Sequence, residues 1–232
     1  LGAEVWLVPP EQLAEARKGL ADELRALGHR PYILNDTEAV LGAVAYAGCV
    51  AELAEQLAEP PEYLVLASGG GTQAGVLLGA KALGLPTRVV GFRPSRVPEA
   101  TVKEQIATVA NEAALLLGLQ VRIGPEEVEN SDDYVGEAYG VVTPAGLDAI
   151  ELLARTEGIL LDPVYSGKAF SGLVDYVRRG IIPAGSRVVF LHTGGQPALF
   201  AYAQEFIEHG GYRMRVVGEV GRGILTAPAG GD

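Results

Sequence analysis

Short apolar runs alternate along most of the chain with longer stretches in which apolar residues recur every three or four positions. The runs are bounded by glycine, proline or acidic residues and are too short for helices, so they indicate strands. The longer stretches indicate amphipathic helices, and the first of them has the apolar residues Leu13, Ala16, Leu20 and Leu24. Strands that alternate with helices predict an α/β protein with mostly parallel twisted sheets and flanking helices.

The expected strands comprise residues 2–9, 30–35, 63–68, 87–92, 159–164 and 186–195. The expected helices comprise residues 10–27, 37–57, 73–83, 98–117, 144–155 and 167–179. The acidic segment 124–134 is expected to form a surface excursion. Residues 210–232 contain one further expected strand, and their glycine- and proline-rich end is expected to be loosely ordered.

The segment LVLASGGGTQAGVLLG, residues 64–79, runs from a strand through three glycines into a helix. Glycine has no Cβ, so Gly69, Gly70 and Gly71 are expected to reach positive φ and to bring their N–H groups against an anion. The helix that begins near Thr72 directs its free N–H groups and the positive end of its dipole to the same place. These four residues are therefore candidates for binding a phosphate group, and a glycine-rich turn without a ligand is the alternative.

This loop differs from the two best-known nucleotide-binding motifs. A dinucleotide fingerprint needs an acidic residue about 20 positions after its glycines, and the chain there reads VVGFRPS. A Walker loop needs Gly-Lys-Ser/Thr, which supplies a phosphate-binding lysine and a magnesium ligand, and none follows Gly71. The loop therefore predicts a single small phosphate group as its ligand.

Composition narrows the classes of partner. The chain has 29 acidic and 18 basic residues, a net charge of −11 and no basic patch, so nucleic acid is not an expected partner. No apolar run reaches the roughly 20 residues that a membrane helix needs, and no export signal is evident, so a cytoplasmic protein is expected. The single cysteine, Cys49, cannot form an internal disulfide and is expected to be a small buried residue, not a nucleophile.

Three more motifs lie in the second half of the chain: YVGEAYG at residues 134–140, DPVYSGK at residues 162–168 and HTGG at residues 192–195. Together with SGGGTQAG, and in this order and spacing, they resemble the D-cysteine desulfhydrase and 1-aminocyclopropane-1-carboxylate deaminase family of pyridoxal 5'-phosphate (PLP) enzymes. The resemblance extends to about Tyr202. It implies a tryptophan synthase β-like PLP-dependent fold (fold type II), in which a small and a large α/β domain hold the cofactor between them.

The resemblance also implies roles for individual residues. It places the phosphate of PLP on the segment from Gly69 to Thr72. It places Tyr165 on or near the pyridine ring, where this residue could also act in catalysis by transferring protons. Thr193 would lie opposite the ring nitrogen, Ser166 would be a further cofactor contact, and Tyr134 would line the substrate side. The resemblance implies no metal.

Three positions have simpler interpretations. Tyr165, at the end of an apolar strand, could serve only to pack in the core. His192 is expected to be a hydrogen-bonded core histidine and not a catalytic residue. Lys168 is expected to begin a helix and to meet solvent or a carboxylate, because the lysine of this motif does not hold the cofactor in the family that the chain resembles.

Ser166 and Thr193 favour one branch of that family. The deaminase branch resembles YEGK and HLGG at these places, whereas this chain has YSGK and HTGG, as the desulfhydrase side does. A carboxylate near the ring nitrogen keeps that nitrogen protonated and makes the ring a stronger electron sink, which the opening of a cyclopropane demands. A hydroxyl suffices for a substrate whose leaving group is a thiolate. The expected reaction is β-elimination of D-cysteine to pyruvate, ammonia and sulfide; 1-aminocyclopropane-1-carboxylate deaminase and L-cysteate sulfo-lyase are alternatives.

The resemblance implies a lysine that forms a Schiff base with PLP, and it places that lysine upstream of the part present here. The lysines of this chain are Lys18, Lys81, Lys103 and Lys168. Because none of them occupies a suitable strand end or helix start, the Schiff-base lysine is expected to be absent from this chain. We therefore expect a C-terminal fragment of a PLP-dependent lyase that is inactive by itself.

The expected domains follow from the same resemblance. Residues 1–36 would be the remainder of the small domain, residues 37–209 the large PLP-binding domain, and residues 210–232 a C-terminal strand and flexible tail. The family implies a homodimer that acts on a small amino acid. A non-catalytic protein that binds PLP or another phosphate ligand, or a partner subunit, is the alternative from another functional class.

Overall fold

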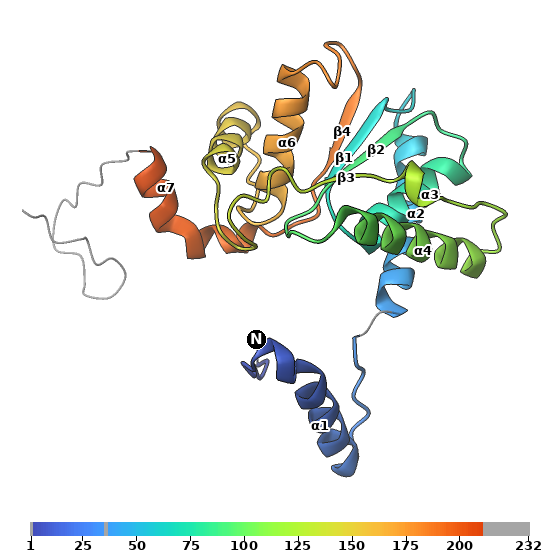
Figure 1. The fold of residues 1–232 in the computed structure, drawn as a ribbon, viewed down its shortest axis with the longest axis vertical. Coiled ribbons are helices and arrows are strands. Elements are labelled where there is room, and N and C mark those ends of the chain that lie inside the picture. The colour runs from blue at the N-terminus through green and yellow to red at the C-terminus, as the bar shows by residue number, and fades with distance from the viewer. Residues whose placement is uncertain (1, 35–36, 211–232) are drawn as a thin grey trace, which may run out of the picture.

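A four-stranded parallel sheet forms the centre of the molecule (Figure 1). The computed structural model describes residues 2–34 and 37–210. The strands are β1 (Tyr63–Ala67), β2 (Arg88–Phe92), β3 (Glu129–Ser131) and β4 (Val188–Leu191), in the order β3-β2-β1-β4. In the register of the sheet, Val65 lies opposite Val90 on β2 and Phe190 on β4. The predicted α/β class with a parallel sheet is confirmed.

The helices follow the predicted ones closely, with ends that differ by a few residues. They are α1 (Leu13–Ala26), α2 (Thr37–Gln56), α3 (Gly71–Ala82), α4 (Glu99–Leu116), α5 (Pro144–Glu157), α6 (Ser166–Arg178) and α7 (Ala203–Gly210), with 3₁₀ turns at Pro10–Gln12, Pro125–Glu127 and Gln196–Tyr202. The last turn and α7 were not expected from the sequence. No helix in the described residues is long and apolar enough to cross a membrane.

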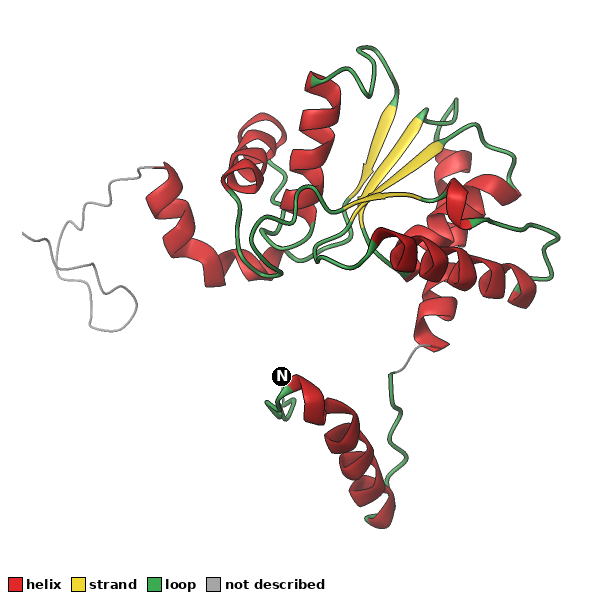
Figure 2. Cartoon of the chain, viewed as in Figure 1, coloured by secondary structure: helices red, strands yellow, loops and turns green. Residues whose placement is uncertain are grey.

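Helices cover both faces of the sheet, which explains why β1 is apolar along its whole length (Figure 2). Leu64 and Leu66 face a layer that includes α2 and α3. Val65 and Ala67 face the opposite layer, where they pack with residues of α6 such as Ala169. Successive side chains of a strand point to opposite faces, so a strand between two helical layers buries every position.

Two expected strands near the N-terminus, at residues 2–9 and 30–35, are absent from the described residues there. These segments have no regular secondary structure, and most of their apolar side chains are open to solvent: Val5 is 77% and Leu7 94% exposed. A strand needs a neighbour for its backbone N–H and C=O groups, and within residues 2–34 and 37–210 neither segment pairs with another strand. Residue 35 and the expected strand within residues 210–232 lie outside the described residues, apart from Gly210, which ends α7.

Two further differences concern the second half of the chain. The expected strand at residues 159–164 is a loop, which turns around Asp162 into α6. The acidic segment 124–134, expected to be only a surface excursion, contains β3. The edge strand β3 is held by backbone pairing with β2 and by the buried side chain of Asn130, so its polar sequence gives no strand signal.

A seam of small residues fixes the position of α3 against α2. Every fourth residue of α3 is a glycine, and a Cβ on any of these glycines would collide with the backbone of an alanine on α2. Such a Cβ would lie 2.8 Å from Ala39 O at Gly71 and 2.9 Å from Ala47 O at Gly79, and at Gly75 it would come closer still to Ala43 O. Because α3 begins where the glycine loop ends, this close approach also positions the loop.

The seam predicts a large difference between two glycine-to-alanine substitutions. Gly75→Ala should destabilise the fold by about 1–3 kcal/mol, because the added methyl group forces the two helices apart. Gly48→Ala on α2 is the matched control, since a Cβ there meets nothing within 4 Å. It should be neutral or stabilise by up to about 1 kcal/mol through helix propensity. Urea unfolding followed by circular dichroism measures both, and equal stabilities would contradict the seam.

Candidate functional site

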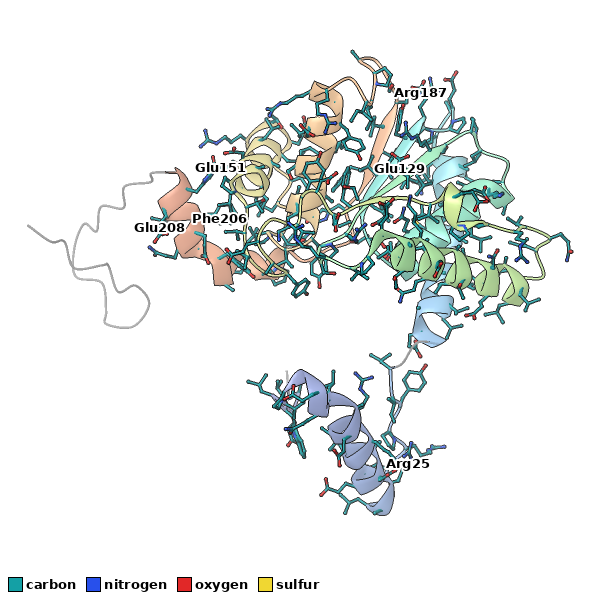
Figure 3. The ribbon with its side chains drawn as sticks, in the orientation of Figure 1. Arg25, Glu129, Glu151, Arg187, Phe206 and Glu208 are labelled. Carbon is teal, nitrogen blue, oxygen red and sulfur yellow. The ribbon has the colours of Figure 1, made fainter. Side chains whose placement is uncertain are left out.

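A pocket opens at the carboxyl ends of the strands, the place where parallel α/β sheets bind ligands. Its volume is about 430 Å³. Four segments line it: the loop after β1, the chain after β2, the turn before α6 and the chain after β4. The lining residues are Ala67, Ser68, Gly69, Gly70, Gly71, Thr72, Pro94, Tyr165, Thr193, Gly194 and Gly195. Arg187, labelled in Figure 3, precedes β4 and marks the opposite ends of the strands.

The pocket brings together six of the eight residues predicted for the site. Gly69, Gly70, Gly71 and Thr72 come from one loop, whereas Tyr165 and Thr193 come from segments about 100 residues later in the sequence, and all six line this pocket. Ser166 and Tyr134 are not among its lining residues.

The glycine loop presents unpaired amides at the start of α3. Ser68 Oγ accepts hydrogen bonds from Gly70 N at 3.2 Å and from Gln73 N at 3.1 Å. Among the described residues, the N–H groups of Gly71 and Thr72 have no protein acceptor. The first amides of a helix point out of its N-terminal end, so these two are free to bind an anion in the pocket.

The reason for the three glycines differs from the prediction. None of them has positive φ, so the expectation of left-handed backbone is wrong. Two of them allow close approach instead: Gly71 meets α2, and a Cβ on Gly69 would lie 3.1 Å from Arg93 Cβ. A Cβ on Gly70 would meet no protein atom within 4 Å. The loop is therefore held by its neighbours, with open space beside its middle residue.

A buried polar network supports the loop from the side of β3. Asn130 Nδ2 donates to Ser68 O at 2.6 Å and to Gln73 Oε1 at 2.7 Å, and Gln73 Nε2 donates to Glu129 O at 2.7 Å. Arg93 Nη1 donates to Asn130 Oδ1 at 2.8 Å. Since Gln73 is fully buried and Asn130 and Arg93 nearly so, loss of one partner would leave others unsatisfied. The network fixes the end of β1 and the first turn of α3 to each other.

The carboxylate of Asp162 organises the opposite wall of the pocket. It is 1% exposed, and its Oδ2 accepts hydrogen bonds from Val164 N at 2.9 Å and Tyr165 N at 2.8 Å. Its Oδ1 accepts from Ser166 N at 2.8 Å and from Ser166 Oγ at 2.6 Å. It also adjoins the loop after β4, since a Cβ on Gly195 would lie 2.7 Å from Asp162 Cγ. One side chain thus holds the turn of Tyr165 by hydrogen bonds and lies directly against the loop that carries Thr193.

The hydroxyl of Tyr165 is hydrogen-bonded to that of Tyr139, and the two rings meet edge to face with centroids 5.9 Å apart. This hydrogen bond, followed by burial, raises the pKa of Tyr165 to about 12. Tyr139 was not predicted as a partner of Tyr165, although it lies in the segment YVGEAYG that the sequence singled out. That segment contains two tyrosines, and the prediction chose Tyr134.

Tyr134 and Ser166 have other partners. Tyr134 OH donates to Asp175 Oδ2 at 2.5 Å, and its ring packs edge to face on Phe92 and Tyr176. It lines a different cavity, of about 470 Å³, between α5 and α6. Ser166 is buried, and its Oγ is engaged with Asp162. The structure therefore places neither side chain against the glycine loop.

None of the four lysines, all of which the structure describes, lines the pocket. Lys81 pairs with Glu127 at 2.5 Å and Lys103 with Glu99 at 2.6 Å, and Lys18 is exposed. For Lys168 the expectation of solvent or a carboxylate partner is wrong: its side chain is buried, and Nζ donates to Val135 O at 2.6 Å.

His192 and Cys49 differ in part from their predicted environments. His192 is half-buried and not deep in a core, and its Nε2 lies 3.0 Å from Leu160 O. Gly194 N donates to its Nδ1 at 3.4 Å, so the ring supports the turn that carries Thr193. Cys49 is also half-buried, and burial raises the pKa of its thiol, which disfavours the thiolate.

Comparison with known proteins places the chain in a family. The model of a family described as pyridoxal-phosphate dependent enzymes matches residues 1–194. A 1-aminocyclopropane-1-carboxylate deaminase of Burkholderia vietnamiensis is 39% identical over 215 residues, which is 89% of this chain and 63% of the relative. A D-cysteine desulfhydrase of Yersinia enterocolitica is 41% identical over 198 residues, or 84% of this chain and 58% of the relative.

A solved structure described as an ACC deaminase homologue superimposes with a TM-score of 0.77 at 34% identity. It covers 88% of this chain, and the chain covers 62% of it. The chain thus spans less than two thirds of the length of these relatives. With a matching family model, sequence and fold, the chain belongs to the family of pyridoxal-phosphate dependent enzymes.

Proposed function

We propose that the glycine loop binds the phosphate of PLP, and that the chain provides the cofactor pocket of a lyase in the group of the D-cysteine desulfhydrases and 1-aminocyclopropane-1-carboxylate deaminases. The observation that carries the proposal is the pair of unpaired amides, Gly71 and Thr72, in one pocket with Tyr165 and Thr193. A phosphate dianion at these amides would gain charge-assisted hydrogen bonds and the favourable end of the α3 dipole.

The residues of the pocket fit PLP in size and in chemistry. A volume of about 430 Å³ is within the range of small-molecule sites, roughly 300–1,000 Å³. The loop of Gly69 to Thr72 would hold the phosphate, Tyr165 offers an aromatic ring, and Thr193 offers a hydroxyl that can donate to a pyridine nitrogen. When bound, PLP supplies an electron sink for the electron pair released by breaking a bond at an amino acid's α carbon.

The Tyr165 hydroxyl is the phenol at this pocket that we consider for proton transfer, and Tyr139 is its hydrogen-bond partner. With a pKa near 12, Tyr165 carries its proton at neutral pH and can donate a hydrogen bond there. Its bond to Tyr139 provides a second phenol that can share or replace that proton. We therefore assign proton transfer to the Tyr165 hydroxyl and include Tyr139 with it. Tyr134 is left out, because its hydroxyl is committed to Asp175 in another cavity.

For the substrate we propose D-cysteine, with β-elimination to pyruvate, ammonia and sulfide. Thr193 lines the pocket, where the deaminase branch that the chain resembles has an apolar leucine. Ser166 no longer contributes to this choice, because its hydroxyl faces Asp162. Since relatives of both names match the chain at similar identity, deamination of the cyclopropane amino acid is the alternative reaction, and L-cysteate sulfo-lyase is another.

A protein that holds PLP without catalysis, or serves as a partner subunit, is the alternative from another class. The observation in its favour is that none of the four lysines lines the pocket. Under either proposal the chain by itself should bind the cofactor without a covalent bond. Assembly as a homodimer, cytoplasmic location and the assignment of residues 1–36 to a small domain stay predictions of the resemblance.

The phosphate assignment predicts that a negative charge at position 70 prevents binding. A Cβ on Gly70 has open space, so Gly70→Asn and Gly70→Asp should both fold, and the two side chains have nearly the same size. The Asp variant should bind at least about tenfold more weakly than the Asn variant, about 1.4 kcal/mol, because its carboxylate repels the phosphate. The probe is 4-deoxypyridoxine 5′-phosphate, which has no aldehyde to react with exposed lysines, measured by equilibrium dialysis.

Two controls interpret that experiment. Pyridoxine without phosphate should bind far more weakly than the phosphorylated probe, and inorganic phosphate should compete with the probe. Equal affinities of the Asn and Asp variants, with no competition by phosphate, would contradict the loop as the anion site.

The wall formed by Asp162 gives a separate prediction. Asp162→Asn replaces an oxygen that accepts two backbone N–H groups by an NH₂ group, so it should destabilise the fold by roughly 1–3 kcal/mol and weaken binding of the same probe. Asp148→Asn is the matched control, because that carboxylate is exposed and pairs with His209 at the surface. It should leave both quantities unchanged. Binding that survives Asp162→Asn at full strength would show that the pocket does not need this wall.

The substrate proposal needs a longer protein that supplies the part of the relatives beyond this chain. Such a protein should release sulfide from D-cysteine faster than it releases ammonia from 1-aminocyclopropane-1-carboxylate. Thr193→Leu should lower the first rate by tenfold or more, because it removes the hydroxyl from the pocket, and Thr193→Ser should keep most of it. A faster reaction with the cyclopropane substrate would select the deaminase alternative.

A further inference from the structure

Lys168 is a buried lysine without a carboxylate partner. Its side chain is 2% exposed, and Nζ donates to two backbone oxygens, Val135 O at 2.6 Å and Ala138 O at 3.3 Å. No carboxylate of the described residues forms an ion pair with it. Burial alone lowers the pKa of Lys168, which reflects the cost of holding the ammonium away from water.

Stability does not account for a lysine at this position. Lys168 lies in the first turn of α6, where the helix dipole disfavours a positive charge. A buried charge also costs free energy that partial bonding to carbonyl groups does not fully repay, and an apolar side chain of similar length would avoid that cost. Because burial of the Lys168 ammonium destabilises the fold, a lysine here indicates a role that an apolar side chain could not perform.

The carbonyl groups of Val135 and Ala138 show which segment Lys168 binds. They belong to residues 134–140, a segment with no helix or strand, which ends next to Tyr139. Two other side chains bind the same segment: Arg96 Nη2 donates to Gly136 O at 2.9 Å, and Tyr202 OH donates to Gly140 O at 2.7 Å. Of these three side chains, only that of Lys168 is buried.

Lys168 also belongs to the element that carries the partner of Tyr139. It is the third residue of α6, and Tyr165 immediately precedes that helix. The first turn of α6 therefore bonds to the segment in two places, by the ammonium at Val135 and Ala138 and by the Tyr165 hydroxyl at Tyr139. The ammonium and the Tyr165 hydroxyl thus bind the same segment from neighbouring positions at the start of α6.

We propose that Lys168 is a positioning residue: its ammonium fastens residues 135–138 to α6 and so holds the Tyr139 hydroxyl against that of Tyr165. It does not touch the pocket and acts only through Tyr139. Its effect on catalysis rests on the proposed function, whereas its effect on the segment does not.

Hydrogen–deuterium exchange on the 232-residue chain tests the geometry. In Lys168→Met, which removes the charge and keeps most of the volume, the amides of Val135 and Val141, which donate to Asp132 O and Ala138 O, should exchange at least tenfold faster. Amides of β1 and α3 should not change. Lys81→Met, which removes an exposed surface pair, is the control and should leave the amides of Val135 and Val141 unchanged. Unchanged exchange of these two amides in folded Lys168→Met would overturn the proposal.

A measurement on the unsubstituted chain decides the case in which Lys168→Met does not fold. With ¹⁵N in the lysine side chains, one ammonium should be protected from solvent exchange and should show scalar coupling to the carbonyl carbons of Val135 and Ala138. Four rapidly exchanging ammonium groups would overturn the proposal.

A double-mutant cycle in the longer, active protein then separates positioning from a purely structural role. Lys168→Met and Tyr139→Phe should each lower kcat, and the double variant should be no slower than the worse single variant, because both act through one hydroxyl. Additive losses would overturn action through Tyr139. If the longer protein has no lyase activity at all, the proposed function fails, while the exchange and NMR results still decide the role of Lys168.

Discussion

The pocket depends above all on one buried carboxylate. Asp162 accepts four hydrogen bonds at the turn into α6 and adjoins the loop after β4. No lysine or arginine of the described residues pairs with it, so backbone amides and one hydroxyl compensate its charge. Such an arrangement is directional, because each lone pair has an assigned donor. The turn of Tyr165 and the loop of Thr193 consequently meet at this carboxylate, although 28 residues separate these two positions in the sequence.

The opposite wall is built by different means. There, small residues let α3 approach α2. Ser68 Oγ accepts hydrogen bonds from the amides of Gly70 and Gln73, and the amides of Gly71 and Thr72 between them stay unpaired. Gln73, Asn130 and Arg93 fasten this wall to the edge strand β3. The two walls thus combine an end with unpaired amides and a side with an aromatic ring and a hydroxyl, a division that suits a cofactor with a phosphate at one end and a ring at the other.

The sequence was most informative where structure is local. The apolar run of β1 followed by glycines and a helix start identified the loop, and all its predicted residues line the pocket, because adjacent positions in a chain cannot move far apart. It was least informative where a residue's environment comes from distant segments. The sequence around Lys168 does not indicate that its ammonium binds two carbonyl groups about 30 positions earlier. The sequence of β3 is polar because pairing with β2 and the side chain of Asn130 stabilise this strand. Tyr134 and Tyr139 occur in one motif, and only the fold distinguishes them. Residues 2–9 have strand-like sequence, but strand formation also requires a neighbour.

The seam between α2 and α3 has a consequence for the lifetime of the binding site. Loops that bind ligands usually open more readily than the core around them. Here the unpaired amides of Gly71 and Thr72 lie where the backbones of α3 and α2 are in contact. This part of the loop should therefore unfold locally only when α3 separates from α2. The site would then be among the last parts of the domain to lose order on heating.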